Sequence, residues 1–281
     1  MPTWAPNLVC TTFVAAALLD AYEQTGDARC LEMAVSAAEY MVEKLFWTEG
    51  NTASFSYPQP GLRSQIHNAN FLAAAVLCRT FRYSSEARFL ESALQATRCS
   101  VAKQKADGSW SYGEAPSQNW IDNFHTGYNL RALRAIDESR GTKEFDANLR
   151  VGFQFYRDHF FREGGAVRYF HDRAYPVDIH CVADSIITLL ELQDLDPANT
   201  DLARSVFQWA FDHLWDEDGY FYYRAMRWYT IRTPYMRWSQ AWMLLAMTRL
   251  FCDRNPKPGE RLRSHSMNSA SQAVSAQTEA R

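Results

Sequence analysis

The residues best suited to acid–base chemistry stand close together near the middle of the chain. Asp122 is followed by His125 and then by Tyr128, at intervals of three residues. Asp122 is the expected N-cap of a helix, and His125 stands in its first turn. Histidine titrates near neutrality and can give or accept a proton, so we predict catalytic roles for these three residues and for Asp178. Both aspartates can also serve simply as helix caps.

Polar and aromatic side chains at similar places elsewhere would line a binding site around this group. Carboxylates, amides and a guanidinium beside Trp and Tyr suit a sugar, because its CH faces stack on rings while its hydroxyls form hydrogen bonds. The alternative is that the polar residues satisfy helix ends and the aromatic residues form the core of each hairpin. The predicted substrate-binding residues are His67, Asn70, Trp110, Tyr112, Trp120, His180, Asp184, Tyr223, Arg237 and Gln240.

These residues belong to a repeat. Four short segments, each with a small residue, three further residues and a tyrosine, recur about every 56 residues. They end at Tyr57, Tyr112, Tyr169 and Tyr223, and a helix-like apolar stretch follows each one. A period of this length accommodates two helices and two connections, and such units bury their apolar faces by stacking on their neighbours.

Two kinds of helix alternate along the chain. The first kind is apolar on most sides and belongs in the interior, and we expect it at 7–24, 66–82, 122–138, 178–193 and 234–252. The second kind carries one apolar stripe and belongs at the surface, and we expect it at 28–46, 86–103, 144–161 and 199–215. We therefore predict an all-α fold, an α/α toroid in which inner helices surround an axis and outer helices surround them.

The predicted toroid is incomplete, with about nine helices where a closed six-hairpin ring has twelve. The first inner helix is expected so soon after Met1 that we favour a chain lacking N-terminal helices of the architecture. A second protomer or a partner chain could also cover the open edge. We assign residues 1–254 to the toroid domain, and the polar composition of residues 255–281 predicts a disordered tail.

Composition excludes several classes of protein. A net charge of −3 and a pI near 6.2 leave no basic footprint for nucleic acid, and no apolar run approaches the roughly 20 residues of a transmembrane helix. The six cysteines show no paired spacing, which predicts reduced thiols in a cytoplasmic protein. We expect no cofactor and no metal, since no glycine-rich phosphate loop occurs and Asp178-Ile-His-Cys181 is not a recognised zinc spacing.

Two resemblances to known families involve the stretch before Tyr128. The run Gln104-Lys-Ala-Asp-Gly-Ser-Trp110 fits the Q-x-x-x-G-x-W core of the repeat in the terpenoid cyclase and prenyltransferase toroids. The run Asp107-Gly-Ser-Trp-Ser-Tyr-Gly113, followed by Trp120-Ile-Asp-Asn-Phe-His-Thr-Gly-Tyr128, resembles proteins associated with polysaccharide biosynthesis. Their toroid is similar to those of glucuronyl C5-epimerases and six-hairpin glycosidases, and this second resemblance covers most of residues 5–252.

The second resemblance implies a carbohydrate-active protein of exopolysaccharide or cell-surface glycan biosynthesis, with a glycan or uronic-acid polymer as its substrate. A hydrolase would use two carboxylates about 5–9.5 Å apart, for which Asp122 with Asp178 or Asp184 are the candidates.

An epimerase or lyase would instead use His125 with Tyr128 or Tyr223, and Arg237 against the uronate carboxylate. Two alternatives stay open. One is a cyclase-like or prenyltransferase-like enzyme, although the Asp-x-Asp-Asp run of triterpene cyclases is absent. The other is a non-catalytic scaffold of a glycan assembly complex.

Overall fold

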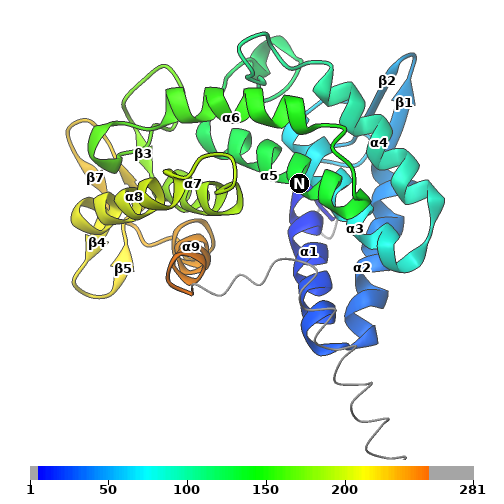
Figure 1. Cartoon of the computed structure of the whole chain (residues 1–281), viewed down its shortest axis with the longest axis horizontal. Helices are drawn as coiled ribbons and strands as arrows, with labels where there is room; N and C mark the ends of the chain where they lie inside the picture. Colours follow the sequence, from blue (N-terminus) through cyan, green and yellow to red (C-terminus); the bar gives the residue numbers. More distant parts are fainter. Residues whose placement is uncertain (1–5, 253–281) are drawn as a thin grey trace, which may run out of the picture.

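The structure of the protein is a computed structural model that describes residues 6–252, in which inner and outer helices alternate along the chain (Figure 1). The inner helices are α1 (Leu8–Thr25), α3 (His67–Ser84), α5 (Asn123–Arg140), α7 (Ile179–Glu191) and α9 (Ala241–Phe251). The outer helices are α2 (Ala28–Tyr40), α4 (Ala87–Val101), α6 (Asp146–Phe160) and α8 (Asn199–Leu214). All but α9 begin within two residues of the predicted start, and a π-helical turn at Met236–Gln240 precedes α9.

The hairpins follow one another around an arc. Each inner helix packs on the next inner helix, and α1, α3, α5 and α7 each pack on the outer helix that follows them. Figure 1 shows α1 and α9 at the two ends of this arc. The predicted all-α toroid with about nine helices is therefore confirmed for the described part of the chain.

Burial differs between the two kinds of helix as their sequences predict. In α7 every residue from Ile179 to Leu189 is buried, because neighbours cover this helix on all sides. In α6 the buried residues form one stripe that includes Leu149, Phe153 and Tyr156, and the opposite face is exposed. An amphipathic helix of that kind covers the inner layer and faces solvent.

The connections between hairpins contain short antiparallel strands. A hairpin of β1 (Phe46–Glu49) and β2 (Thr52–Phe55) precedes α3, and β4 (Trp215–Asp216) pairs with β5 (Tyr220–Phe221) after α8. The strand β3 (Val177–Asp178) leads directly into α7 and pairs with β6 (Arg224–Ala225), which pairs in turn with β7 (Thr230–Ile231). This small sheet joins the start of α7 to the segment that leads into α9.

Side-chain caps fix where the site helices begin. Asp122 Oδ1 accepts a hydrogen bond from His125 N at 3.0 Å, and Asp178 Oδ1 accepts one from His180 N at 2.8 Å. Asn7 caps α1 in the same way through Cys10 N. These bonds satisfy amides of the first helical turn, which have no partner within the helix. The caps predicted for Asp122 and Asp178 are thus present, and both aspartates are held at helix starts.

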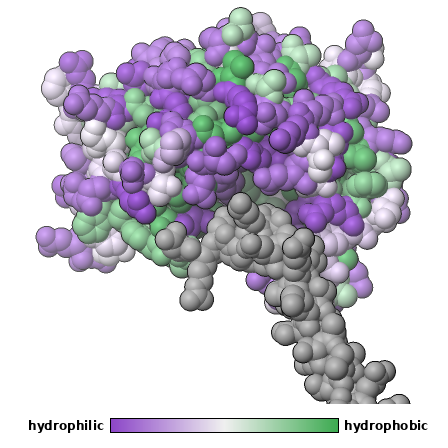
Figure 2. All heavy atoms as spheres, viewed as in Figure 1, coloured by the Kyte–Doolittle hydropathy of each residue, from purple (hydrophilic) through white to green (hydrophobic). Residues whose placement is uncertain are grey.

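The two ends of the arc expose apolar surface. Within α1 only Leu8, Thr12, Ala15 and Leu19 are buried, and within α9 only Met243 and Ala246 are. The exposed apolar side chains include Val14 (57%) on α1 and Leu244 (63%) and Phe251 (62%) on α9. The face of the molecule drawn in Figure 2 is otherwise mostly hydrophilic.

No helix within residues 6–252 is both long and apolar enough to cross a membrane. The tail prediction for residues 255–281 lies outside the described residues.

Candidate functional site

The candidate site lies at the mouth of the arc, where the connections between hairpins meet the N-termini of α5 and α7. His125 stands in the first turn of α5, and its Nδ1 lies 2.7 Å from Oδ2 of Asp122. Asp122 is 2% exposed, whereas the side chain of His125 is 21% exposed. A carboxylate accepts hydrogen bonds only, so Nδ1 carries the proton of this bond while Asp122 is ionised. The second ring nitrogen, Nε2, forms no hydrogen bond within residues 6–252.

Aromatic rings surround this pair. The rings of Tyr112 and Trp120 stack with centroids 4.5 Å apart, and the ring of Tyr112 lies 4.6 Å from that of His125. Trp120 also donates from Nε1 to Asp122 Oδ2 at 2.9 Å. Asp122 therefore accepts three hydrogen bonds, two of them involving His125, and these hold its carboxylate against the imidazole. The structure brings together Tyr112, Trp120, Asp122 and His125, as predicted.

A second histidine lies one inner helix further along. His180 Nε2 is 2.7 Å from the hydroxyl of Tyr128, and its ring stacks on Trp238 at 4.2 Å. His180 is 1% exposed, and burial, together with the charge of His125, lowers its pKa to about 3. Burial also raises the pKa of Tyr128 well above its ordinary value. Both groups are consequently neutral near pH 7 and share one hydrogen bond.

Phe124 lies between the two histidines. Its ring centroid is 4.0 Å from that of His125 and 5.0 Å from that of His180. On the far side of Tyr128 stand Phe13 of α1 and Trp242 of α9, whose rings are 5.2 Å apart. The first and last inner helices thus complete the aromatic lining of the site across the open side of the arc.

Asp178 lies at the start of α7 but is not accessible to solvent. It is fully buried, and its Oδ2 accepts two hydrogen bonds from Arg224, from Nε at 2.9 Å and from Nη2 at 2.6 Å. Its Oδ1 accepts from Trp238 Nε1 at 3.2 Å and from the backbone of His180. Burial raises the pKa of Asp178, while the guanidinium of Arg224 opposes that rise. The carboxylate fixes the positions of Arg224, Trp238 and the first turn of α7, and it is too buried to bind a substrate.

Four of the predicted substrate-binding residues use their polar atoms within the protein. Asn70 bonds Ser54, Ser100 and the backbone of Phe55. Gln240 bonds both backbone groups of Phe221, and Trp110 donates to the carbonyl of Ser100. Asp184 is fully buried between α5 and α7 and pairs with Arg131. The structure places these four in the packing around the mouth and does not bring them into it.

The three remaining predictions lie at the edges of the site. His67 is buried at the start of α3, where its Nε2 is 3.0 Å from Glu114, and burial lowers its pKa. Tyr223 packs edge-on against Tyr235 at 5.0 Å, with Arg224 over its face. Arg237 is exposed in the turn before α9 and has no ion pair within the described residues. Of the three, only Arg237 has a side chain that is exposed and unpaired within the described residues.

Sequence reasoning did not assign Phe13, Phe124, Arg224 or Trp242 to the site. Trp238 and Trp242 stand four residues apart at the start of the last inner helix, a spacing that places both on one face. That signal was available in the sequence. The pairing of Arg224 with Asp178 spans 46 residues and depends on the β3–β6 pairing, for which the two-residue strands leave no periodic pattern.

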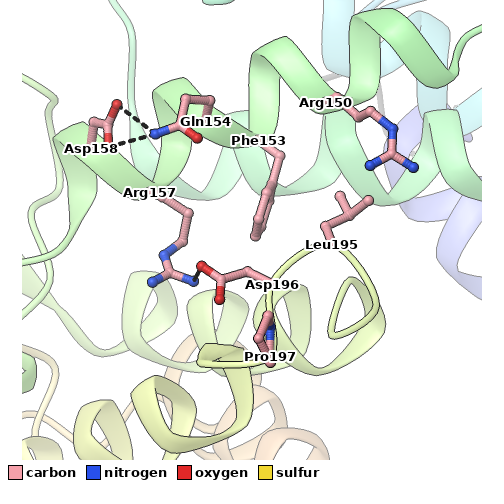
Figure 3. A pocket seen from close by; sticks show the side chains of 8 residues that line it. All are labelled: Arg150, Phe153, Gln154, Arg157, Asp158, Leu195, Asp196 and Pro197. Carbon is pink, nitrogen blue, oxygen red and sulfur yellow. Dashed lines mark hydrogen bonds and ion pairs between the residues drawn. The ribbon is translucent and has the colours of Figure 1, made fainter.

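A separate groove lies at the opposite end of α7. It has a volume of about 450 Å³ and runs between α6 and the connection into α8 (Figure 3). Arg157 and Asp196 form an ion pair of 2.9 Å across it. It contains none of the predicted site residues. Within residues 6–252 no three His, Cys, Asp or Glu side chains gather as a set of metal ligands.

Comparisons with known proteins identify the fold. No family model and no curated protein sequence matches the chain. Among solved structures, the chain is similar to a cellobiose 2-epimerase from Bacillus thermoamylovorans B4167, with a TM-score of 0.70 over 88% of this chain and 75% of that one. It is also similar to a sugar epimerase from a ruminal bacterium, with a TM-score of 0.73 over 93% and 75%.

A third similar structure is the unsaturated glucuronyl hydrolase of Bacillus sp. GL1, with a TM-score of 0.69 over 87% of this chain and 74% of that one. Sequence identity is 13% to each of the three structures. The likeness establishes the α/α-toroid fold, which is also the fold that the second resemblance implies.

Proposed function

We propose that the protein is an enzyme that acts on a glycan and moves a proton at a sugar carbon, as epimerases and lyases do. The observation that carries this proposal is the His125–Asp122 pair. One ring nitrogen of His125 is fixed by a buried carboxylate at 2.7 Å, and the other has no protein partner in the described structure. A histidine held in this way has the tautomer and orientation of a general base.

The chemistry follows from the two ring nitrogens. Nε2 would take a proton from a sugar carbon next to a carboxylate or carbonyl, and the electron pair left on that carbon would spread into the neighbouring group. The imidazolium formed is stabilised by Asp122, which is already in place and needs no reorganisation. Return of a proton to the opposite face would give an epimer. Loss of a leaving group from the next carbon would give an unsaturated sugar.

A second proton-carrying group lies on the other side of Phe124. His180 and Tyr128 share one hydrogen bond, and both are neutral near pH 7. The positive charge that forms on His125 acts on His180 as well, since His125 contributes to the lowered pKa of His180. Tyr128 is 4% and His180 1% exposed, so we assign this pair the role of holding Phe124 and the first turns of α5 and α7 in place, without contact with the substrate.

The hydrolase alternative has weaker support. It needs a second accessible carboxylate across from Asp122. Asp178 already accepts bonds from Arg224, Trp238 and its own helix, and Asp184 is buried against Arg131. A cyclase-like or prenyltransferase-like enzyme needs an apolar cavity, whereas this mouth contains charged groups. The scaffold alternative predicts that Asp122 and His125 are hydrogen-bonded to protein groups and shielded from solvent. Asp122 agrees with it, being 2% exposed and fully bonded, whereas the side chain of His125 is 21% exposed and its Nε2 has no partner within the described residues.

The proposed substrate class is supported by the aromatic and charged lining and by the similar structures, which are a sugar epimerase, a cellobiose epimerase and a glucuronyl hydrolase. We propose a glycan that contains uronic acid, with Arg237 as the cation that meets its carboxylate. A setting in exopolysaccharide or cell-surface glycan biosynthesis, in the cytoplasm, is supported by the sequence resemblance and by six free cysteines.

We also propose that a second copy of this chain covers the open edge of the arc. Val14 on α1 and Leu244, Leu245 and Phe251 on α9 are exposed, whereas α3, α5 and α7, which have an inner helix on each side, are mostly buried. Exposed apolar surface of this kind marks protein interfaces. Sedimentation velocity over a range of protein concentrations tests this, and a monomer at all concentrations would contradict it.

Product analysis tests the proposed reaction. Wild-type protein would be incubated with fragments of polyglucuronate, polygalacturonate and polymannuronate and with neutral gluco-oligosaccharides, and the products followed by NMR. We expect either a change of configuration at one carbon or an unsaturated product in the uronate series. Simple cleavage to two saturated fragments would favour the hydrolase alternative, and no change in any substrate would contradict the proposal.

A further inference from the structure

A cluster of exposed aromatic and basic side chains stands beside the candidate site. It occupies the tip of the β6–β7 hairpin and the segment before α9. We call it the rim patch, and it consists of Arg227, Trp228, Tyr229, Tyr235, Met236 and Arg237. Trp228 is 81% exposed, Met236 78% and Tyr229 61%. Large apolar side chains this exposed are uncommon unless they bind something.

The rim patch is attached firmly to the site. β6 pairs with β3 so that Arg224 lies opposite Asp178, and the two side chains form an ion pair at 2.6 Å. Met226 N donates to Tyr229 O at 2.8 Å, which closes the tip of the hairpin beneath Trp228. Figure 1 shows β7 near β3, at one end of the molecule. The hairpin that contains part of the patch is thus joined to the mouth at Asp178.

The charge of the rim patch is positive. The guanidinium of Arg227 lies over the ring of Trp228 at 4.6 Å, and neither Arg227 nor Arg237 forms an ion pair within residues 6–252. Of the acidic groups nearby, Asp178 is neutralised by Arg224, and Asp216 accepts a hydrogen bond from Tyr222 at 2.6 Å. Two free guanidinium groups beside exposed rings suit a ligand that has both carboxylates and CH faces.

We propose that the rim patch is a second binding subsite, which holds a distant part of an acidic glycan chain while the reacting sugar lies at His125. Trp228 would stack on a sugar ring of this distant part and Arg227 would bind its carboxylate, whereas Arg237 meets the carboxylate of the reacting sugar. The protein then prefers extended uronic-acid oligosaccharides to mono- or disaccharides. This inference rests on the proposed function, because it assumes that the mouth takes a glycan.

The charge and the position of the patch favour this occupant. A protein partner would need about 800 Å² on each side for a stable interface, and the patch contains six side chains. Tyr235 of the patch packs edge-on against Tyr223, which joins the patch to the outer side of the mouth. A glycan chain can bind there without a wide flat surface.

The test compares ligand length across matched variants. Calorimetry would measure the binding of uronic-acid disaccharides and hexasaccharides, and of a neutral gluco-hexasaccharide, to wild type, Trp228→Ala and Arg227→Gln. Two variants on α8 serve as controls, Phe211→Ala for an exposed aromatic ring and Arg204→Gln for an exposed arginine. Near-ultraviolet circular dichroism and thermal melting would confirm that every variant is folded.

We expect Trp228→Ala to weaken binding of the uronate hexasaccharide about tenfold, with binding of the disaccharide changed less than twofold. Arg227→Gln should weaken the same ligand and reduce the dependence of its binding on salt, because one ion pair with a carboxylate is lost. Both control variants should match wild type. The wild type should bind the neutral hexasaccharide more weakly than the uronate.

The results that would contradict the proposed function differ from those that would contradict only the second subsite. If wild type binds none of the oligosaccharides, both the proposed function and this inference are overturned. If wild type binds the hexasaccharide and Trp228→Ala binds it equally well, the inference alone is overturned and the patch belongs to another partner. Equal losses for the disaccharide and the hexasaccharide would also overturn it, since Trp228 would then act on the inner site.

Discussion

Asp122 and His125 are joined twice, through the helix cap and through the imidazole. The carboxylate accepts from the backbone of His125 at 3.0 Å with one oxygen and lies 2.7 Å from its Nδ1 with the other. One side chain therefore both begins α5 and sets the protonation pattern of the histidine. The same geometry allows Asp122 to serve both as the helix cap and as the partner of the imidazole.

Replacing Asp122 separates the two roles. Asparagine is a good N-cap, so Asp122→Asn should retain most of the stability, whereas Asp122→Ala should lose about 1 kcal/mol. Both variants lose the charge that stabilises the imidazolium, and turnover should fall about 100-fold or more in each. Thermal melting and initial rates measure the two effects. Near-normal turnover in Asp122→Asn would show that the aspartate is a cap alone.

Replacing Trp120 tests how much one hydrogen bond to the Asp122 carboxylate contributes to turnover. Trp120→Phe retains a ring to stack on Tyr112 and removes the Nε1 donor that lies 2.9 Å from Asp122. We expect turnover to fall about threefold to tenfold, as befits loss of one hydrogen bond to a charged group, with KM little changed. Steady-state kinetics distinguishes this from a loss of packing. If KM rises while kcat stays constant, Trp120 serves chiefly to bind substrate.

Gly127 should not tolerate a side chain, although it stands within α5. A Cβ there would overlap Oδ2 of Asp184. Gly→Ala inside a helix normally stabilises by about 1 kcal/mol, but here we expect Gly127→Ala to destabilise by about 2 kcal/mol.

Chemical denaturation of Gly127→Ala, of Asp184→Ala and of the double variant measures the coupling between the two positions. The penalty for Gly127→Ala should shrink in the Asp184→Ala background, and additive effects would contradict this explanation.

The lowered pKa of His180 predicts a pH effect on stability. Its pKa is about 3 in the folded protein and 6.5 in its ordinary state. Between these values the unfolded chain binds the extra proton, so the contribution of His180 to stability falls as pH falls from 6.5. Asp184, whose pKa is raised from 3.8 to about 7, acts in the opposite direction, so the wild-type profile alone mixes the two.

The comparison with His180→Gln isolates the histidine. The difference in free energy of unfolding between wild type and this variant should shrink by at most about 1.4 kcal/mol for each pH unit below 6.5. Urea denaturation at pH 6.5, 5.5 and 4.5 measures it. A difference that is constant over this range would mean that His180 is not held neutral by burial.

The edge of the arc gives a prediction about assembly. Leu244 is 63% exposed on α9, in a stripe with Phe251. If a second copy covers this stripe, Leu244→Asp should convert the protein to a monomer, because it places a charge in an apolar interface. Val151→Asp, at a 48% exposed position on α6, is the matched control and should leave the assembly unchanged. Sedimentation velocity measures the oligomeric state of both variants.

The sequence predicts the helices well because their information is local. Periodic apolar residues and caps such as Asp122 and Asp178 indicate where inner and outer helices begin, and the structure has them there. The site is predicted less completely. Asp184 was expected in the mouth because it lies one turn beyond His180, but it faces α5 and pairs with Arg131, 53 residues away in sequence. Such long-range pairs have no local pattern.

The central claim is that His125 takes a proton from a sugar carbon. The most direct measurement is incorporation of deuterium from D₂O into uronic-acid oligosaccharides, followed by NMR for wild type, His125→Ala and His213→Ala. His213 lies on the exposed side of α8 and serves as the control. We expect exchange at one carbon in wild type and in His213→Ala, and an exchange rate at least about 100-fold slower in His125→Ala. Equal exchange rates in wild type and His125→Ala would contradict this claim.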